Sequence, residues 1–433
     1  MRGIGAELVL RAATRTARRA ATLAILPAIT LAVILSAAAV VMPIVVEAQV
    51  PEGVPRITNG AKPSQGTETW KLEKLWSAGG EEGEVIFGLI TQALVDDAGD
   101  IYLLDSQLSE VKVFSPVGEL KKTLSREGEG PGEVRGPTDL FFLPDGQLGL
   151  VQLFPGKVIT IDRNGNPGTP ITIGGADPTA GGFVVLLDGA SGGGNLYFAG
   201  LYMTMENAVQ NRTSFLARFS PQGVEQVRYL EKKSRLDLAN IEIVERDQHF
   251  VYPRRWAASG SGEVFAAPEI DRYAIYVYRP DGTMDRVIER EFTPRPRTAK
   301  ELERLDAVVQ AQTRQLPGTP KYDFEKTEPA ISGLNLRSNG ELWVTSSRSG
   351  YEQPKGIMLT YDVFNAAGKF IKQVAVACDG DGLEDGLFFA GDDRMLLVRG
   401  MADAGVALQG GAMESAEGEE AAPMEVVLYR ITH

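Results

Sequence analysis

The chain repeats a short unit, and its clearest copy begins with Gly99-Asp100-Ile101-Tyr102-Leu103-Leu104-Asp105. Here a glycine precedes a strand-like run of aliphatic and aromatic residues, a second such run follows at 111–114, and a turn at Gly118 follows that. Another apolar stretch, at 89–95, lies before the leading glycine. Runs of this composition between Asp-Gly and Pro-Gly turns are typical of short antiparallel strands.

The same unit recurs along the rest of the chain. Its leading glycines are Gly146, Gly194, Gly262 and Gly340, and a degenerate sixth copy holds the runs 394–398 and 426–431. Each copy reads as four strands, and four-stranded units at this spacing are typical of propeller blades. The sequence therefore predicts an all-β fold, a six-bladed β-propeller over 70–433, and the regular count disfavours an open β-sandwich array.

The two ends of the repeat region predict how the ring closes. The sixth copy stops after its third strand, at Ile431, so it lacks an outermost strand. The strand-like segment 70–76, beginning at Trp70, lies before the first copy and has no other partner there. We expect this segment to complete the last blade, because closure removes the open sheet edge.

One motif carries a family resemblance. The segment Gly128-Glu129-Gly130-Pro131-Gly132-Glu133-Val134, closed by Gly136-Pro137, resembles the inter-blade motif of secreted bacterial six-bladed propellers of the NHL-like and TolB-like group. A weaker copy occupies 79–85, and the resemblance covers about 70–433. It implies extracytoplasmic binding or scaffolding, although propellers host unrelated activities. Insertions in the third, fourth and fifth units depart from the plain NHL spacing, so no ligand residues are carried over.

The first residues read as an export signal. Arginines between Arg2 and Arg19 precede an apolar run at 20–46, and Val46-Glu47-Ala48 offers a cleavage site. This pattern predicts a signal peptide at 1–48, cleaved after Ala48. The apolar run is also long enough to span a bilayer, so an uncleaved N-terminal membrane anchor remains the alternative. We expect a periplasmic or secreted protein with a linker at 49–69, touching a membrane only through an uncleaved segment.

Composition excludes several functions. The formal net charge is −13, which argues against binding nucleic acid, whose phosphates require cations. Cys378 is the single cysteine, and its apolar run predicts a buried strand thiol. The two histidines, His249 and His433, exclude a zinc site built on three imidazoles. We expect no cofactor and no catalytic residue.

An acidic cluster at 379–385 invites a calcium interpretation. Leu383 breaks the alternation of oxygen ligands, and Ala390 stands where a bidentate carboxylate belongs, so we expect a solvated loop and no metal. The alternative function is a calcium-dependent hydrolase or lyase, like the lactonase-like propellers, with an axial metal site. Asp139, Asn335 and Asp385 lie near predicted innermost strands and are its candidate ligands.

Two insertions interrupt the repeats. Residues 297–317 begin with a capping-box pattern at Thr298 and Glu301 and continue with Leu302, Leu305 and Val309 at helical spacing. They predict a helical insertion that packs against the propeller. Residues 401–424 are rich in Gly, Ala and Glu and predict an acidic low-complexity loop.

Loop length points to one working face. The connections after the first and third strand of each unit are short, whereas the long segments fall in the other class, at 199–214, 231–255, 292–330, 346–356 and 400–424. Insertions on one face of a repeat protein commonly mark its binding surface. We therefore expect a non-enzymatic binding or scaffold protein that docks a protein, peptide or glycan there. The candidate contact residues are Arg135, Tyr202, Arg254, Arg255, Arg272, Tyr273, Tyr322 and Tyr351.

Overall fold

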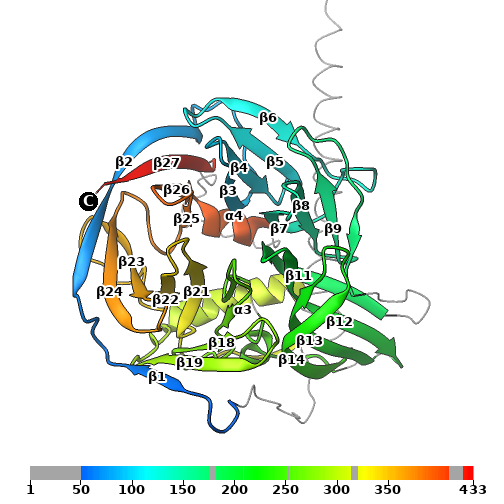
Figure 1. Cartoon of the computed structure of the whole chain (residues 1–433), viewed down its shortest axis with the longest axis vertical. Helices are drawn as coiled ribbons and strands as arrows, with labels where there is room; N and C mark the ends of the chain where they lie inside the picture. Colours follow the sequence, from blue (N-terminus) through cyan, green and yellow to red (C-terminus); the bar gives the residue numbers. More distant parts are fainter. Residues whose placement is uncertain are drawn as a thin grey trace, which may run out of the picture.

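The computed structural model describes residues 50–174, 182–207, 209–238, 240–251, 253–313, 320–408 and 423–432. Within these ranges the chain forms a ring of six four-stranded antiparallel blades around a central axis (Figure 1). The predicted fold class is confirmed. The predicted signal segment at 1–48 lies outside the described residues.

Each blade places its first strand innermost and its fourth outermost. The first three blades are β3 (Ile90–Val95), β4 (Ile101–Asp105), β5 (Glu110–Phe114) and β6 (Leu120–Leu124); β7 (Pro137–Phe142), β8 (Leu148–Gln152), β9 (Lys157–Ile161) and β10 (Ile171–Thr172); β11 (Gly182–Gly192), β12 (Asn195–Glu206), β13 (Val209–Phe219) and β14 (Glu225–Asp237). The other three are β16 (Trp256–Ala258), β17 (Val264–Ala266), β18 (Ala274–Tyr278) and β19 (Met284–Arg290); β21 (Ile331–Leu336), β22 (Leu342–Ser346), β23 (Ile357–Phe364) and β24 (Phe370–Ala377); β25 (Gly386–Phe389), β26 (Arg394–Arg399), β27 (Glu425–Thr432) and β2 (Thr67–Gly79).

The residue pattern of each strand reflects its place in the blade. Strand β4 has a strand on each side within its own sheet and a neighbouring blade on each face, and all of its residues are buried. Strand β6 forms an outer edge and is mostly exposed, and within it only Leu124 is buried. The turn between β5 and β6 requires glycine, because Gly118 has a φ of 89° and an added Cβ would lie 2.6 Å from the Trp76 ring.

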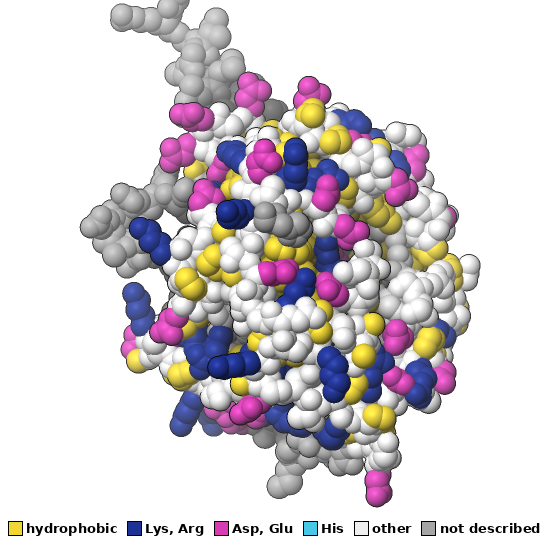
Figure 2. All heavy atoms as spheres, turned by 60° about the vertical axis from the view of Figure 1, so that its left-hand side comes forward, with side chains coloured by type: hydrophobic (Ala, Val, Ile, Leu, Met, Phe, Trp, Pro, Cys, Tyr) yellow, Lys and Arg dark blue, Asp and Glu magenta, His cyan; other side chains and the backbone are white. Residues whose placement is uncertain are grey.

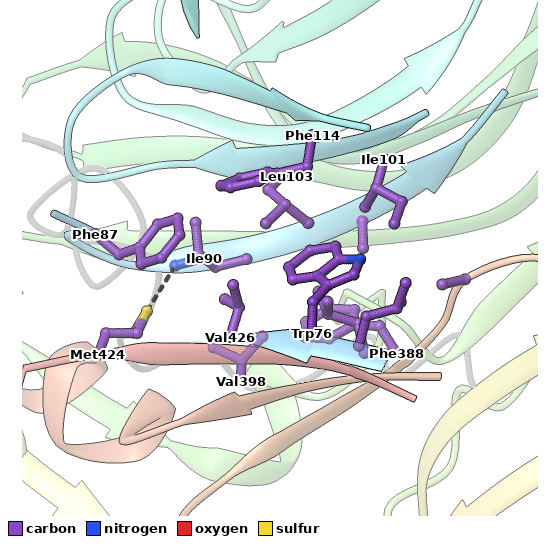
Figure 3. Packing of buried hydrophobic residues seen from close by; sticks show 14 of the residues in the cluster. Trp76, Phe87, Ile90, Ile101, Leu103, Phe114, Phe388, Val398, Met424 and Val426 are labelled. Carbon is purple, nitrogen blue, oxygen red and sulfur yellow. Dashed lines mark hydrogen bonds between the residues drawn. The ribbon is translucent and has the colours of Figure 1, made fainter. Parts of the chain in front are cut away.

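Hydrophobic clusters fill the spaces between neighbouring blades. The cluster between the last and first blades contains Trp76, Ile90, Phe114 and Val426, and Figure 3 shows these side chains converging from both sides of the seam. Corresponding clusters lie between the other pairs of blades. The ring is therefore stabilised by apolar burial between blades, as well as by the hydrogen bonds within each sheet.

The predicted ring closure is confirmed. Residues 71–79 of β2 pair antiparallel with β27 and supply the missing outermost strand. The N-terminal half of β2 extends further than predicted, because 67–71 also pair in parallel with β24 of the fifth blade. Within the segment 49–69, interpreted above as a linker, β1 (Arg56–Asn59) adds a parallel strand to β19 of the fourth blade. The start of the described chain thus runs along the outer edges of three blades, visible in blue in Figure 1.

Connections alternate between two faces because successive strands are antiparallel. The first-to-second and third-to-fourth connections share one face, here called the short-turn face. The second-to-third connections and the links between blades share the other, the long-loop face. One predicted long connection is wrong: at 199–214 the strands β12 and β13 continue as a ladder, so the expected loop is a hairpin whose pairing extends to Glu206 and Val209. The connection predicted at 231–255 begins later, because β14 extends to Asp237. The described parts of 238–255, 291–330, 347–356 and 400–424 belong to the long-loop face.

The remaining elements lie within these connections. They are β15 (Glu242–Val244), α2 (Glu245–Gln248), α3 (Ala299–Thr313), β20 (Lys321–Asp323) and α4 (Met401–Leu408). Helix α4 was not expected, since its segment was predicted to be a low-complexity loop. Its Met401 and Ala404 pack against the cluster between the last and first blades. None of the helices within the described ranges is long and apolar enough to cross a membrane.

Candidate functional site

Two insertions on the long-loop face join into one platform. Strand β15, between the third and fourth blades, pairs in parallel with β20, between the fourth and fifth. The Arg297 guanidinium donates to both carboxylate oxygens of Glu245 at 2.6 and 2.7 Å, and to Glu328 at 2.8 Å. Arg246 forms a further ion pair with Glu325 at 2.7 Å. These contacts tie together segments that are far apart in the sequence and hold the platform in one arrangement.

The platform has its own apolar core. Leu236, Ile241 and Ile243 are buried there, and Val309 of α3 and Tyr322 of β20 pack against them. The cluster places α3 against the other insertion. The platform is therefore held together by apolar packing as well as by ion pairs.

The start of α3 has the predicted capping box. The Thr298 amide donates to Glu301 Oε2 at 2.7 Å, and the Glu301 amide donates to Thr298 Oγ1 at 3.3 Å. Arg295 also donates to both Glu301 oxygens, at 3.1 and 2.8 Å. Hydrogen bonds from Arg295, and then from the Thr298 amide, lower the pKa of Glu301 to about 2. The acid therefore anchors the helix start as a carboxylate at neutral pH.

Arg254 lies where the innermost strands converge. Its backbone amide donates to Asp188 Oδ2 on β11 at 2.9 Å, and its carbonyl accepts the Leu334 amide of β21 at 2.7 Å. Its guanidinium donates to the Thr91 carbonyl of β3 at 2.6 Å and lies 4.7 Å from the centre of the Phe388 ring on β25. The side chain is exposed to solvent. It extends from the connection before β16 to β3 and β25, so it lies across the axis on the long-loop face.

Two acids lie on the neighbouring innermost strands β7 and β11, and one of them, Asp188, accepts the Arg254 amide. Asp139 on β7 is buried, and its Oδ1 accepts Gln92 Nε2 of β3 at 2.8 Å, while its Oδ2 accepts the Gly189 amide at 3.0 Å. Asp188 precedes that glycine. Burial, together with the negative charge of Asp188, raises the pKa of Asp139 well above its usual range. The innermost strands thus build a small polar cluster from Asp139, Asp188 and Gln92, joined to Arg254 through the Arg254 backbone amide.

Three of the predicted contact residues pack inside the protein. The Arg255 side chain is buried, contacts the His249 ring and donates to the His249 carbonyl at 2.7 Å. Tyr273 is buried between the fourth and fifth blades, and its hydroxyl donates to Asp362 Oδ2 at 2.8 Å. Tyr202 lies on β12, stacks on the Phe215 ring at 4.7 Å and donates to Glu225. Their contacts link parts of the propeller to one another.

The other predicted residues are spread over the long-loop side. Arg135 pairs with Glu129 at 2.6 Å, and Arg272 pairs with Glu269 and Glu289. Tyr351 lies beneath the Arg295 guanidinium, 4.2 Å from its ring centre, and Tyr322 stacks on Phe324 in the platform. Of the predicted set, Arg254 reaches the axis. Figure 2 likewise shows Lys and Arg interspersed with Asp and Glu on the side of the molecule that it displays.

Two of the three candidate ligands for an axial calcium ion are engaged elsewhere in the protein. The Asp385 oxygens accept the Asp381 and Gly400 amides, at 2.9 and 2.8 Å, and so form part of a loop. Asp139 is engaged with Gln92 and Gly189, as described above. Across the described residues, no group of three or more His, Cys, Asp or Glu side chains is placed to hold a metal ion.

The histidine and cysteine that could serve as a base and a nucleophile, His249 and Cys378, are both held by contacts within the fold. Burial, and next the charge of Arg255, lower the pKa of His249 to about 2. Cys378 follows β24, half-buried, and burial raises the pKa of its thiol. An imidazole with so low a pKa is a weak base, and a thiol with a raised pKa is protonated and a weak nucleophile at neutral pH.

Asp188 and Gln92 belong to the axial cluster, and sequence reasoning missed both. Asp188 interrupts the apolar run 183–187 just before Gly189, and Gln92 interrupts the strand 90–95. The available signal was a polar residue in an innermost strand, the same signal that singled out Asp139, Asn335 and Asp385. Gln92, Asp139 and Asp188 come from three different blades, and they lie together because the ring brings those blades to one axis.

Comparison with known proteins gives a likeness of fold. The chain matches no protein-family model, and no curated protein matches it. Among solved structures, a DUF4221-family protein from Bacteroides vulgatus has a TM-score of 0.45 and 11% identity, covering 84% of this chain and 99% of that one. A luciferin-regenerating enzyme has a TM-score of 0.42 and 12% identity, covering 83% and 96%. A gluconolactonase from Xanthomonas campestris has 0.41 and 11%, covering 79% and 87%. The chain is thus similar to six-bladed propellers at low identity, and nothing about activity follows.

Proposed function

We propose that this chain is an extracytoplasmic, non-enzymatic binding or scaffold propeller of the NHL-like and TolB-like group. A protein, peptide or glycan of the cell envelope docks on its long-loop face. The observation that carries the proposal is the platform, in which two insertions on this face share a parallel strand pair, a buried core and ion pairs. A preformed surface binds at a lower entropic cost than a loop that must order on binding.

Export supports the same proposal. The basic start, apolar run and Ala48 site describe a signal peptide, and the fold begins soon afterwards with β1 at Arg56. A mature protein that starts at Gln49 retains every strand of the ring. N-terminal sequencing of exported protein is expected to begin at Gln49, and an intact Met1 in the membrane fraction shows an anchor instead.

Exposed apolar side chains allow a matched test of the face. Ile86 and Leu383 lie in links between blades on the long-loop face and are 78% and 55% exposed. Val117 and Val224 lie in turns on the short-turn face and are 72% and 64% exposed. These two pairs match in character and in exposure, so equal substitutions on the two faces disturb folding to a similar degree.

The experiment is affinity capture from an envelope extract, with purified wild type and variants as bait. Ile86→Asp with Leu383→Asp is expected to reduce capture of the partner at least tenfold, while Val117→Asp with Val224→Asp leaves it unchanged. Tyr351→Ala tests the aromatic contact predicted from sequence. A partner that survives the first pair and is lost with the second refutes the assignment of the long-loop face.

A further inference from the structure

A buried arginine lies on the third blade, on the side that packs against the platform. Arg212 is on β13, in the hairpin by which β12 and β13 extend onto the long-loop face, and it is 3% exposed. It lies opposite Met203 on β12 and Ser234 on β14, so these three side chains share one face of the sheet. Leu236, two residues further along β14 on the same face, belongs to the apolar core of the platform. Arg212 is therefore enclosed at the junction of the blade and the platform.

The guanidinium of Arg212 has an incomplete set of hydrogen bonds. Its Nε donates to Gln210 Oε1 at 3.0 Å, and its Nη2 contacts the same oxygen. Its Nη1 is buried and has no hydrogen-bond partner among the residues that the structure describes. A buried donor that makes no hydrogen bond is destabilising, and more so when it carries a charge. One neutral amide therefore leaves both a donor and a positive charge unmatched.

No carboxylate forms an ion pair with Arg212 within the part of the chain that the structure describes. The positions beside it and diagonal to it on β12 and β14 include no acid, being Leu201, Met203, Met205, Lys232, Ser234 and Leu236. Lys232 is itself paired with Asp247 at 2.6 Å. Burial lowers the pKa of Arg212 to about 9, so its side chain is still a cation at neutral pH. The junction therefore encloses an unpaired positive charge, which is costly in apolar surroundings.

The groups around Arg212 are suited to bind an anion. Ser234 lies across from Arg212, and Ser214 follows it on the same face of β13. Neither serine hydroxyl makes a hydrogen bond to another described residue, and a hydroxyl can rotate to donate. A hydrogen bond from a guanidinium to an anion is charge-assisted and stronger than one between neutral groups. One cation flanked by two hydroxyls and by apolar side chains matches a single negative charge on a compact group.

We propose that Arg212, Ser214 and Ser234 form an anion site between the third blade and the platform. Its ligand is a compact monovalent anion, a halide or a carboxylate, which accepts a hydrogen bond from Arg212 Nη1. The bound anion neutralises the buried guanidinium and stabilises the packing of the blade against the platform. The site is independent of the partner that docks on the long-loop face.

Urea unfolding of the purified mature chain tests the site, because urea adds no ions. Chloride or acetate replaces the bulkier gluconate at constant ionic strength. An anion that binds only the folded protein lowers the unfolding constant, by nearly tenfold for each tenfold rise in its concentration above Kd. Arg212→Met is expected to remove this dependence for both anions. In gluconate alone the variant is expected to be at least as stable as the wild type, because it buries no unpaired charge.

Arg228→Met is the matched control for the loss of an arginine from the same blade. Arg228 lies on β14 and is paired with Glu225 and Glu231, so its charge is already neutralised. The control is expected to change the unfolding constant while keeping the wild-type dependence on chloride and acetate. If Arg212→Met does not fold, Arg212→Gln takes its place.

Crystals of the wild type grown with bromide locate the ion directly, since bromide is a halide with a strong anomalous signal. An anomalous peak is expected within hydrogen-bond distance of Arg212 Nη1. A response to either anion that requires Arg212 supports the site. The proposal is overturned if the wild type and the Arg212 variant respond equally to chloride and to acetate, and equally if no bromide peak lies beside Nη1 while chloride has no effect that requires Arg212.

Discussion

Tyr273 is a residue type that is common at binding surfaces, yet its side chain is buried and stabilises the fold. Its hydroxyl donates to Asp362, which also contacts Arg290 and accepts Gln373 Nε2 at 2.9 Å. These side chains come from the fourth and fifth blades, so a small polar network connects the two. Burial, and then the charge of Asp362, raise the pKa of Tyr273 well above its usual range, which keeps the hydroxyl protonated as a donor.

Tyr273→Phe is expected to destabilise the protein by about 1–3 kcal/mol, because the buried Asp362 carboxylate loses a donor. Urea denaturation measures the change. The matched control is Tyr278→Phe, since Tyr278 is equally buried and its hydroxyl makes no hydrogen bond among the described residues. The control is expected to stay within about 0.5 kcal/mol of wild type. Equal effects for both variants refute the role of the hydroxyl.

Helix α3 shows how an element depends on its tertiary setting. It has an N-terminal capping box, yet a helix of about this length is marginal in water by itself. Val309 packs on the Leu236, Ile241 and Ile243 cluster, and Arg295 anchors Glu301 at the opposite end. The helix is therefore stable as part of the platform, held at both ends.

Val309→Asp is expected to release α3, because it places a charge against the buried cluster. Limited proteolysis measures this release as faster cleavage within 292–320. If docking contributes about 1.4 kcal/mol or more, cleavage is expected to be about tenfold faster or more than in the wild type. Glu303→Ala, at an exposed position of the same helix, is the control and leaves the rate unchanged. An unchanged rate in Val309→Asp shows that α3 does not depend on this contact.

At the scale of the whole molecule, stability depends on the N-terminal strand that closes the ring. Strand β2 completes the sixth blade and contributes Trp76 to the core at the seam, while Trp70 packs on Trp343 of the fifth blade at 4.6 Å. Strand β1 extends the same segment to the fourth blade. The segment therefore contributes to three blades, although it comes first in the described chain.

Deleting 49–78 is expected to lower the melting temperature sharply and to promote association, because it removes Trp76 and exposes the edge of β27. Deleting 49–66 is the graded control. It removes β1 and keeps β2, so a smaller decrease is expected. Calorimetry of the two truncated proteins beside the mature chain gives the comparison, and equal melting temperatures for all three contradict closure by β2.

The sequence by itself determined the propeller, its blade count, its closing strand and the capping box of α3. Each of these depends on signals that are local in the chain, such as turn glycines, alternating strands and a four-residue cap. Only the tertiary structure decided the axial cluster and the platform. Arg254 lies 66 residues from Asp188 and 163 from Thr91, and its contacts with them arise because the ring brings every innermost strand to one axis. No local pattern encodes such a convergence, since it depends on the closure of the whole ring.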